Sequence, residues 1–218
     1  MNIVLEGITK KYRRGTRVQT VLKDINLEMT SGNFWFISGE SGSGKSTLLN
    51  IIAGLSRVTE GKVFYGEREL TNSDEKVRAE LRRKYAGIAT QDSDLVPYLS
   101  VYENMQLASA VRGDAEGNRE EYENLLDAVG LLPLKKEYPE NMSGGEIKRA
   151  AIARALVAAP SVIIMDEPTA NLDRENVKKV LTLLRKTADS GSTVIISSHE
   201  KEARTYCDKE YNLVIHGE

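Results

Sequence analysis

The sequence has few of the residues that mark exported, disulfide-bonded or membrane-spanning proteins. Its only cysteine is Cys207, so no disulfide can form within the chain and no cysteine-based metal site can be built. The most apolar segment, residues 150–159, is interrupted by Arg154 and is far shorter than the roughly 20 residues of a membrane-spanning helix. We therefore expect the protein to work in a reducing compartment. If it acts at a membrane, we expect another chain to cross that membrane.

Neither sign of charge dominates. The chain has 30 Lys and Arg residues against 32 Asp and Glu residues, for a formal net charge of -2, and the two signs are mixed along it. Proteins that bind nucleic acids usually present a basic face, so this composition does not favour a nucleic-acid partner. The length, 218 residues, suits one large domain with a sizeable core.

One stretch carries a specific binding motif, G-x-x-x-x-G-K-[ST], the phosphate-binding P-loop. It consists of Gly39, Glu40, Ser41, Gly42, Ser43, Gly44, Lys45, Ser46 and Thr47. Its glycines let successive backbone N–H groups converge on phosphate oxygens at the start of a helix. In this motif the lysine reaches the β- and γ-phosphates and the serine after it offers a hydroxyl to Mg²⁺. The apolar run at 34–37 and the helical pattern at 48–53 provide the required strand and helix, so we expect phosphate to bind here.

The remaining periodicity predicts an α/β fold. Alternating patterns indicate antiparallel strands near the N-terminus, and longer apolar runs indicate buried strands. Expected strands cover residues 3–9, 18–29, 34–37, 61–66, 85–90, 162–165 and 193–198, and expected helices cover 74–84, 101–112, 118–129, 146–158 and 174–189. Because strand patterns disappear between 92 and 159, we expect a P-loop core with a mixed sheet and an N-terminal antiparallel subdomain (1–91 and 160–218), with a helical subdomain inserted at 92–159.

A second anion site is predicted where the last inserted helix begins. Ser143 and Glu146 form the S-x-x-E capping box, a common helix start. Capping does not explain Gly144 and Gly145, since each glycine in a helix costs up to about 1 kcal/mol relative to alanine. Two bare backbone amides beside a serine hydroxyl at a helix N-terminus can bind a second phosphate.

Polar side chains follow several of the predicted strands. Asp166 and Glu167 end the run at 162–165, where Asp166 can hold Mg²⁺ through water and Glu167 can deprotonate an attacking water. Gln91 and His199 also follow strands, and ligands of α/β sheets bind at these carboxyl ends. The alternative is that the acidic pair caps the next segment and that Gln91 and His199 are ordinary loop residues.

Two further segments suggest contacts with other molecules. Tyr12, after the first strand, offers a flat face on which adenine could stack, although an edge-strand tyrosine needs no ligand. The loop at 92–99 holds Leu95, Val96, Tyr98 and Leu99 in a polar setting. We expect some of these to pack inward and the exposed ones to mark a contact surface, and we expect serine at 95 and 96 to disrupt that contact.

The order of these motifs resembles the ATP-binding cassette (ABC) of ABC transporters over essentially the whole chain. The matching positions are Tyr12, residues 39–47, Gln91, the Ser-Gly-Gly-Glu signature at 143–146, Asp166, Glu167, Asp173 and His199. The signature and residues 170–173 are most similar to the subgroup of lipoprotein release, macrolide export and antimicrobial-peptide export.

This resemblance implies an ATPase that uses ATP and Mg²⁺ and works as a homodimer, or as a heterodimer with a similar chain. It implies that Tyr12 stacks on adenine, that Gln91 contacts Mg²⁺, that Lys45, Glu167 and His199 serve catalysis, and that Asp173 couples the two subunits. The signature would bind the ATP held by the other subunit. It also implies a separate transmembrane permease, and hence a cytoplasmic chain bound peripherally to the inner face of the membrane.

Two other functions share these motifs. A cassette can regulate a membrane partner without transport, as in cell division, or it can act on nucleic acids or ribosomes. The second group usually carries a coiled-coil or zinc insertion or two cassettes in one chain, and this sequence has none of them.

Overall fold

Two sheets organise the chain in a computed structural model that describes residues 1–71, 73–90, 95–114 and 117–214. The antiparallel sheet has the order β2-β1-β4-β5, and its strands are β1 (Ile3–Arg14), β2 (Arg17–Met29), β4 (Glu60–Tyr65) and β5 (Arg68–Glu69). The parallel sheet has the order β6-β7-β8-β3-β9, and its strands are β3 (Phe34–Ser38), β6 (Ala86–Ala89), β7 (Val162–Asp166), β8 (Thr193–Ser197) and β9 (Lys209–Asn212). The expected antiparallel and parallel strands are thus divided between two sheets.

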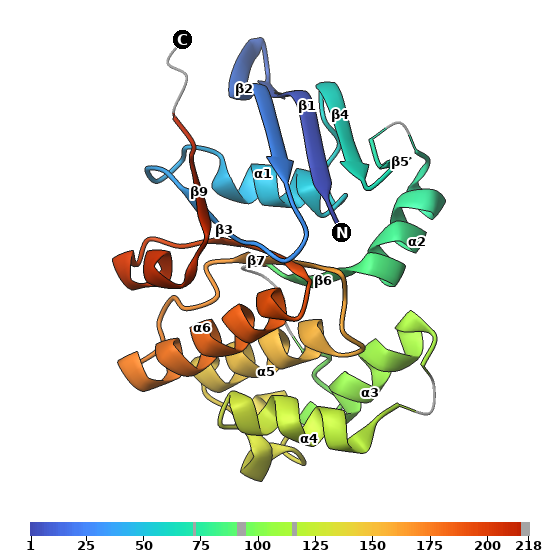
Figure 1. The fold of residues 1–218 in the computed structure, drawn as a ribbon, viewed down its shortest axis with the longest axis vertical. Coiled ribbons are helices and arrows are strands. Elements are labelled where there is room, and N and C mark those ends of the chain that lie inside the picture. Colours follow the sequence, from blue (N-terminus) through green and yellow to red (C-terminus); the bar gives the residue numbers. More distant parts are fainter. Residues whose placement is uncertain (72, 91–94, 115–116, 215–218) are drawn as a thin grey trace.

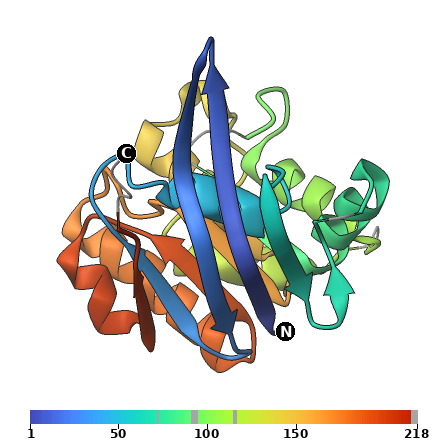
Figure 2. The same cartoon turned by 90° about the horizontal axis from the view of Figure 1, so that it is seen from above.

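Helix α1 (Lys45–Ile52) lies between the two sheets (Figures 1 and 2). Alternate residues of β3 explain this layering, because successive side chains of a strand point to opposite faces. Trp35 and Ile37 join the cluster that includes α1 and the antiparallel sheet. Phe34 and Phe36 join the cluster on the other face, with residues of α5 (Gly144–Leu156) and α6 (Arg174–Asp189). Strand β3 is therefore buried on both faces.

Helices α3 (Val101–Arg112) and α4 (Arg119–Ala128) lie beyond α5 in Figure 1 and share a third core cluster with it. Helix α2 (Glu75–Tyr85) lies on the side of the antiparallel sheet and packs near β6. Short 3₁₀ helices occupy Leu132–Leu134, Pro139–Asn141 and Lys201–Tyr206. Within the described residues, no helix combines the length and apolar character needed to cross a membrane.

The sequence predictions of the longer elements are confirmed, with differences at their edges. Tyr85 ends α2 instead of starting β6, because the strand pairs with β7 only from Ala86 onward. Strand β9 was not predicted, since its sequence Lys-Glu-Tyr-Asn has no apolar run. Among the described strands it pairs only with β3 and so forms the edge of the sheet, where a polar strand is tolerated.

A glycine sets the spacing between β6 and α5. A Cβ atom at Gly87 would lie 2.1 Å from the carbonyl oxygen of Ala155 and 2.8 Å from Cγ of Pro160. Both contacts are too close, and the first is to backbone, so a side chain would force the helix away from the sheet.

We predict that Gly87→Ala lowers the free energy of unfolding by about 2 kcal/mol or more, because overpacking displaces α5. Gly144→Ala is the matched control, since a Cβ there meets no atom within 4 Å and alanine favours helix. Urea denaturation measures both. Equal unfolding midpoints for the two variants would show that this close approach imposes no constraint.

Candidate active site

The P-loop joins the end of β3 to the start of α1. Gly39, Gly42 and Gly44 have φ angles of 147°, 78° and 100°, a region that favours glycine. A Cβ at Gly39 would lie 2.6 Å from both the carbonyl oxygen of Leu213 and Oγ of Ser43. No side chain caps α1, so its first N–H groups point out of the helix end, where an anion can accept from them.

Two polar side chains of the loop suit an anionic ligand. Lys45 is buried, and its Nζ donates to the carbonyl oxygens of Gly39 at 2.9 Å and Glu40 at 3.0 Å, across the loop. Within the described residues, the buried Oγ of Ser43 has no hydrogen-bond partner. A buried hydroxyl without a partner is costly, and a phosphate oxygen would satisfy it. Ser46 and Glu40 are exposed at the rim.

The carboxyl end of β7 presents Asp166 and Glu167 beside β8. Asp166 is buried and accepts a hydrogen bond from the Ser197 hydroxyl. The N–H of Glu167 donates to both Oγ and the carbonyl oxygen of Ser197, each at 3.1 Å. Glu167 has a φ of 50°, a strained conformation for a residue with a side chain, which these bonds help to hold.

Glu167 also contacts His199, the residue predicted from the end of β8. Oε1 of Glu167 lies 3.1 Å from Nε2 of His199. A pocket of about 330 Å³ brings His199 and Ser198 together with Gly39 and Glu40 of the P-loop. Strand β8 lies between β7 and β3, and the three strands are parallel. The acidic pair and the P-loop therefore both lie at the carboxyl ends of the strands of this sheet.

The described residues include no group of three or more His, Cys, Asp or Glu side chains that could hold a metal ion. Mg²⁺ differs from most metals in that it is usually held by one or two carboxylates together with substrate phosphates and waters. One buried carboxylate at Asp166, with the Ser46 hydroxyl at the start of α1, fits that pattern. Gln91, the other predicted metal contact, lies outside the described residues.

The predicted second anion site lies at the N-terminus of α5. Ser143 and Glu146 form both bonds of the capping box, and the Ser143 hydroxyl donates to Oε2 of Glu146 at 2.7 Å. The hydroxyl and the N–H of Ser143 hold the pKa of the Glu146 carboxyl below its usual range. To bind a phosphate, this hydroxyl must exchange partners. Gly144 is exposed, and a Cβ at Gly145 would lie 3.3 Å from Cδ2 of Leu172.

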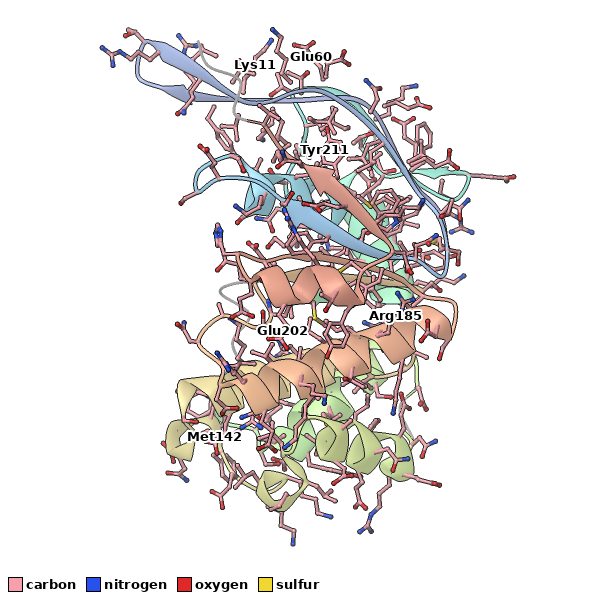
Figure 3. All side chains as sticks on the ribbon, turned by 60° about the vertical axis from the view of Figure 1, so that its left-hand side comes forward. Lys11, Glu60, Met142, Arg185, Glu202 and Tyr211 are labelled. Carbon is pink, nitrogen blue, oxygen red and sulfur yellow. The ribbon has the colours of Figure 1, made fainter. Side chains whose placement is uncertain are left out.

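The signature and the hairpin that carries Tyr12 lie at opposite ends of the molecule in Figure 3. Figure 3 shows Met142, the residue before the signature, at the end opposite to Lys11, the neighbour of Tyr12. Tyr12 lies on the β1–β2 hairpin, is 44% exposed, and has Nζ of Lys10 at 4.8 Å from its ring centre. Of the predicted residues, the structure therefore brings the P-loop, Asp166, Glu167 and His199 together, and it separates the signature from Tyr12.

A buried arginine links the signature to Asp173. Arg149 donates from Nε to the carbonyl oxygen of Gly145 at 3.3 Å, and from Nη1 to the carbonyl oxygen of Val129 and to Oδ1 of Asn176, both at 2.8 Å. Asn176 in turn donates from Nδ2 to Asp173 at 2.6 Å. The backbone and side chain of Asn176 hold the pKa of Asp173 below its usual range while Asp173 caps α6.

Sequence reasoning missed several residues of this region. Arg149 and Asn176 carry no motif of their own, and Ser197 stands in an apolar strand. Lys148 was missed as well: its Nζ donates to the carbonyl oxygen of Ala170 at 3.2 Å. Burial lowers the pKa of Lys148, although the nearby carboxylates of Glu167, Asp166 and Glu200 act in the opposite direction. The only available signal was the presence of polar residues in otherwise apolar patterns.

The loop prediction needs one correction. Leu95 is 4% exposed and packs in the third core cluster, whereas Tyr98 is 88% exposed. Replacing Leu95 would therefore disturb the core, and Tyr98 is the residue that can report on a contact. Residues 92–94 of the loop lie outside the described residues.

A P-loop beside an acidic pair at the carboxyl ends of a parallel sheet defines a nucleoside-triphosphate hydrolase of the P-loop class. Comparison with known proteins identifies the family within this class. The profile described as ABC transporter matches residues 22–170. The ABC transporter ATP-binding protein MJ1508 of Methanocaldococcus jannaschii is 39% identical over 97% of this chain and 95% of its own. The lipoprotein-releasing system ATP-binding protein LolD of Alcanivorax borkumensis is 35% identical over 94% of this chain and 91% of its own.

A solved structure agrees. The ATP-binding cassette MJ0796, in a dimeric post-hydrolysis state bound to ADP and Pi, superimposes with a TM-score of 0.91. It is 31% identical, and the match covers 99% of this chain and 97% of that one. The chain therefore belongs to the ABC transporter family, as an ATP-binding subunit with the ABC ATPase fold.

We predict that Arg149→Met lowers the free energy of unfolding by about 2–4 kcal/mol, because it leaves the buried carbonyl oxygen of Val129 and the half-buried Oδ1 of Asn176 without this donor. Arg119→Met is the control: Arg119 is exposed and pairs only at the surface with Glu123, so its loss changes stability by less than about 1 kcal/mol. Urea titrations of both variants measure the difference. If the two variants unfold at the same urea concentration, the Arg149 bonds do not stabilise the fold.

Proposed function

We propose that this chain hydrolyses ATP in a two-fold dimer and drives a separate transmembrane permease of the export or mechanical-release type. The observation that carries the proposal is the presence of two phosphate-type helix N-termini, at α1 and α5, in a sequence that holds one P-loop. One P-loop holds one nucleotide, so the second site is free to serve the nucleotide of another copy.

In this proposal the P-loop binds the phosphates of ATP. Backbone N–H groups of residues 39–47 and the Lys45 ammonium donate to the phosphate oxygens, and Tyr12 stacks on adenine. Ser46 and, through water, Asp166 would hold Mg²⁺, together with Gln91. When bound, Mg²⁺ would offset the negative charge that develops on the phosphate oxygens during hydrolysis.

Glu167 is the proposed general base. It follows β7, one strand away from the P-loop strand β3 across β8, and its carboxylate would accept a proton from the water that attacks the γ-phosphate. The contact between Glu167 and His199 supports a second role, in which His199 orients the base and contacts the γ-phosphate. The strained backbone of Glu167 is typical of residues whose position is fixed for function.

The dimer would complete each site. In a two-fold arrangement the same patch of each subunit meets its partner, so Ser143, Gly144, Gly145 and Glu146 close over the other subunit's ATP. Asp173, linked to the signature through Arg149, would couple the two sites. The dimeric form of MJ0796 supports this assembly. We also propose that residues 92–159 form the helical unit that carries the signature, since the buried residues of the third cluster all lie between 95 and 157.

The type of coupling rests on the similarity to LolD, a lipoprotein-releasing protein, and on the signature sequence. The permease would place this chain at the inner face of the membrane. The second candidate is a cassette that regulates a membrane partner without transport. Turnover stimulated by a transported substrate would separate the two, since a regulator has no such substrate.

Sharing of sites is tested by mixing two inactive variants, Glu167→Gln and Ser143→Arg. Loss of a general base costs about 10²–10⁴-fold, so Glu167→Gln alone should turn over ATP at least about 100-fold more slowly than wild type. Ser143→Arg alone should also be inactive, because the arginine side chain would obstruct the signature that closes over the other subunit's ATP. In a mixed dimer both lesions fall in one shared site and the other site is intact. Random pairing makes about half of the dimers mixed, so turnover should recover to about a quarter of wild type if the sites act independently.

Differently tagged chains verify that mixed dimers form, and each variant mixed with itself is the control. A mixture with verified mixed dimers that is no more active than its components would show that each chain uses its own signature.

Tyr98→Ser tests the permease contact. Tyr98 is the exposed aromatic of the loop before α3, and truncating a central aromatic anchor of an interface costs about 2 kcal/mol or more, which is about 30-fold in affinity. We expect permease binding to weaken by that factor while basal ATPase activity stays within about two-fold. Val111→Ser, an exposed apolar position at the other end of α3, is the control. Equal permease affinity for both variants would place the contact elsewhere.

A further inference from the structure

The side chain of Ser197 forms hydrogen bonds with both members of the acidic pair. It is the last residue of β8, it is fully buried, and it pairs with Asp166 across the sheet. Its hydroxyl donates to Oδ1 of Asp166 and accepts the N–H of Glu167 at 3.1 Å. The single proton and the lone pairs of a hydroxyl allow this combination.

Each of these two bonds restrains a different degree of freedom. The bond to Asp166 restrains the rotation of a buried carboxylate by engaging its Oδ1. The bond from Glu167 holds the peptide that leads into its left-handed conformation, at a φ of 50°. Rotation of the hydroxyl therefore cannot change one residue without affecting the other.

The rest of β8 shows that packing does not require a serine here. The three residues before Ser197 are Val194, Ile195 and Ile196, all fully buried. A larger apolar side chain would continue this pattern, but it would leave a 6% exposed carboxylate without its hydroxyl donor, and such a group is costly to bury.

We propose that Ser197 is a positioning residue, whose hydroxyl holds the Mg²⁺-facing carboxylate of Asp166 and the proposed base Glu167 in one fixed mutual geometry. This inference rests on the proposed ATPase function. Ser197 touches neither nucleotide nor metal itself, and it acts through its two neighbours on β7. Bonds of this kind behind a metal-facing group are typically worth about 10–100-fold in metal affinity or activity.

The test compares Ser197→Thr with Ser197→Val. Both variants enlarge a fully buried side chain by nearly the same volume, so they share the packing cost, and only threonine keeps the hydroxyl. Thr193→Val is the matched control, because Thr193 is an equally buried hydroxyl on the same strand whose Oγ1 donates to the carbonyl oxygen of Met1, at the other end of β8.

Binding of a fluorescent ATP analogue, with excess Mg²⁺ and with EDTA, is the first readout, and ATP turnover is the second. We expect Ser197→Val to lose about 10-fold or more of the Mg²⁺-dependent gain in affinity relative to Ser197→Thr, with similar affinities in EDTA. The turnover number should fall by at least a similar factor. Thr193→Val should lose thermal stability while keeping the Mg²⁺-dependent gain.

Ser197→Ala provides the same comparison if the larger side chains prevent folding, with wild type as the hydroxyl-bearing partner. Equal Mg²⁺ dependence and equal turnover with and without the hydroxyl would overturn the proposal while wild type remains an active ATPase. Failure of the proposed function gives a different result, because wild type itself would then show neither ATP turnover nor Mg²⁺-dependent binding.

Discussion

Burial of β3 on both faces fixes the place of the P-loop. Alternate residues of the strand pack against α1 on one side and against α5 and α6 on the other. A shift of one residue in its pairing with β8 would reverse these faces, so the register is strongly determined. The end of β3 therefore lies at a defined position beside the ends of β8 and β7. The distance from phosphate-binding loop to acidic pair is set by the hydrophobic core.

The sequence was informative wherever a local pattern carried the signal. Long apolar runs predicted the buried strands, and the capping box located the start of α5 at Ser143. Strand β9 could not be predicted, because a polar edge strand depends on its neighbour β3 and not on its own composition. The prediction for the loop before α3 was incomplete for a related reason. Because this loop has no periodicity, the sequence could not distinguish buried Leu95 from exposed Tyr98.

The same contrast between local sequence patterns and contacts with distant segments applies to the candidate site. The P-loop and the pair Asp166-Glu167 are contiguous in sequence, so their chemistry could be predicted from the motifs. The groups that hold them come from distant segments. Ser197 reaches Asp166 across 31 residues of sequence, and Arg149 reaches Asn176 across 27. Such contacts depend on which strands and helices become neighbours, and that information is absent from the local pattern.

Several groups assigned to the nucleotide already have hydrogen-bond partners within the chain. Lys45 donates to two carbonyl oxygens of its own loop, the Ser143 hydroxyl donates to Glu146, and Glu167 contacts His199. Binding a phosphate at these groups exchanges one partner for another, so each exchange contributes less than a newly formed bond would.

An exchange of hydrogen-bond partners at the signature can also move residues further along the chain. If Gly145 moves toward a partner's phosphate, the carbonyl oxygen that accepts from Arg149 moves with it, and Arg149 is bonded through Asn176 to Asp173. Because this path is buried at Arg149, a displacement at the signature cannot be absorbed by solvent there. The proposed coupling of the two sites therefore has a continuous set of hydrogen bonds within each chain, from the half-site that closes over the partner's ATP to the capping residue of α6.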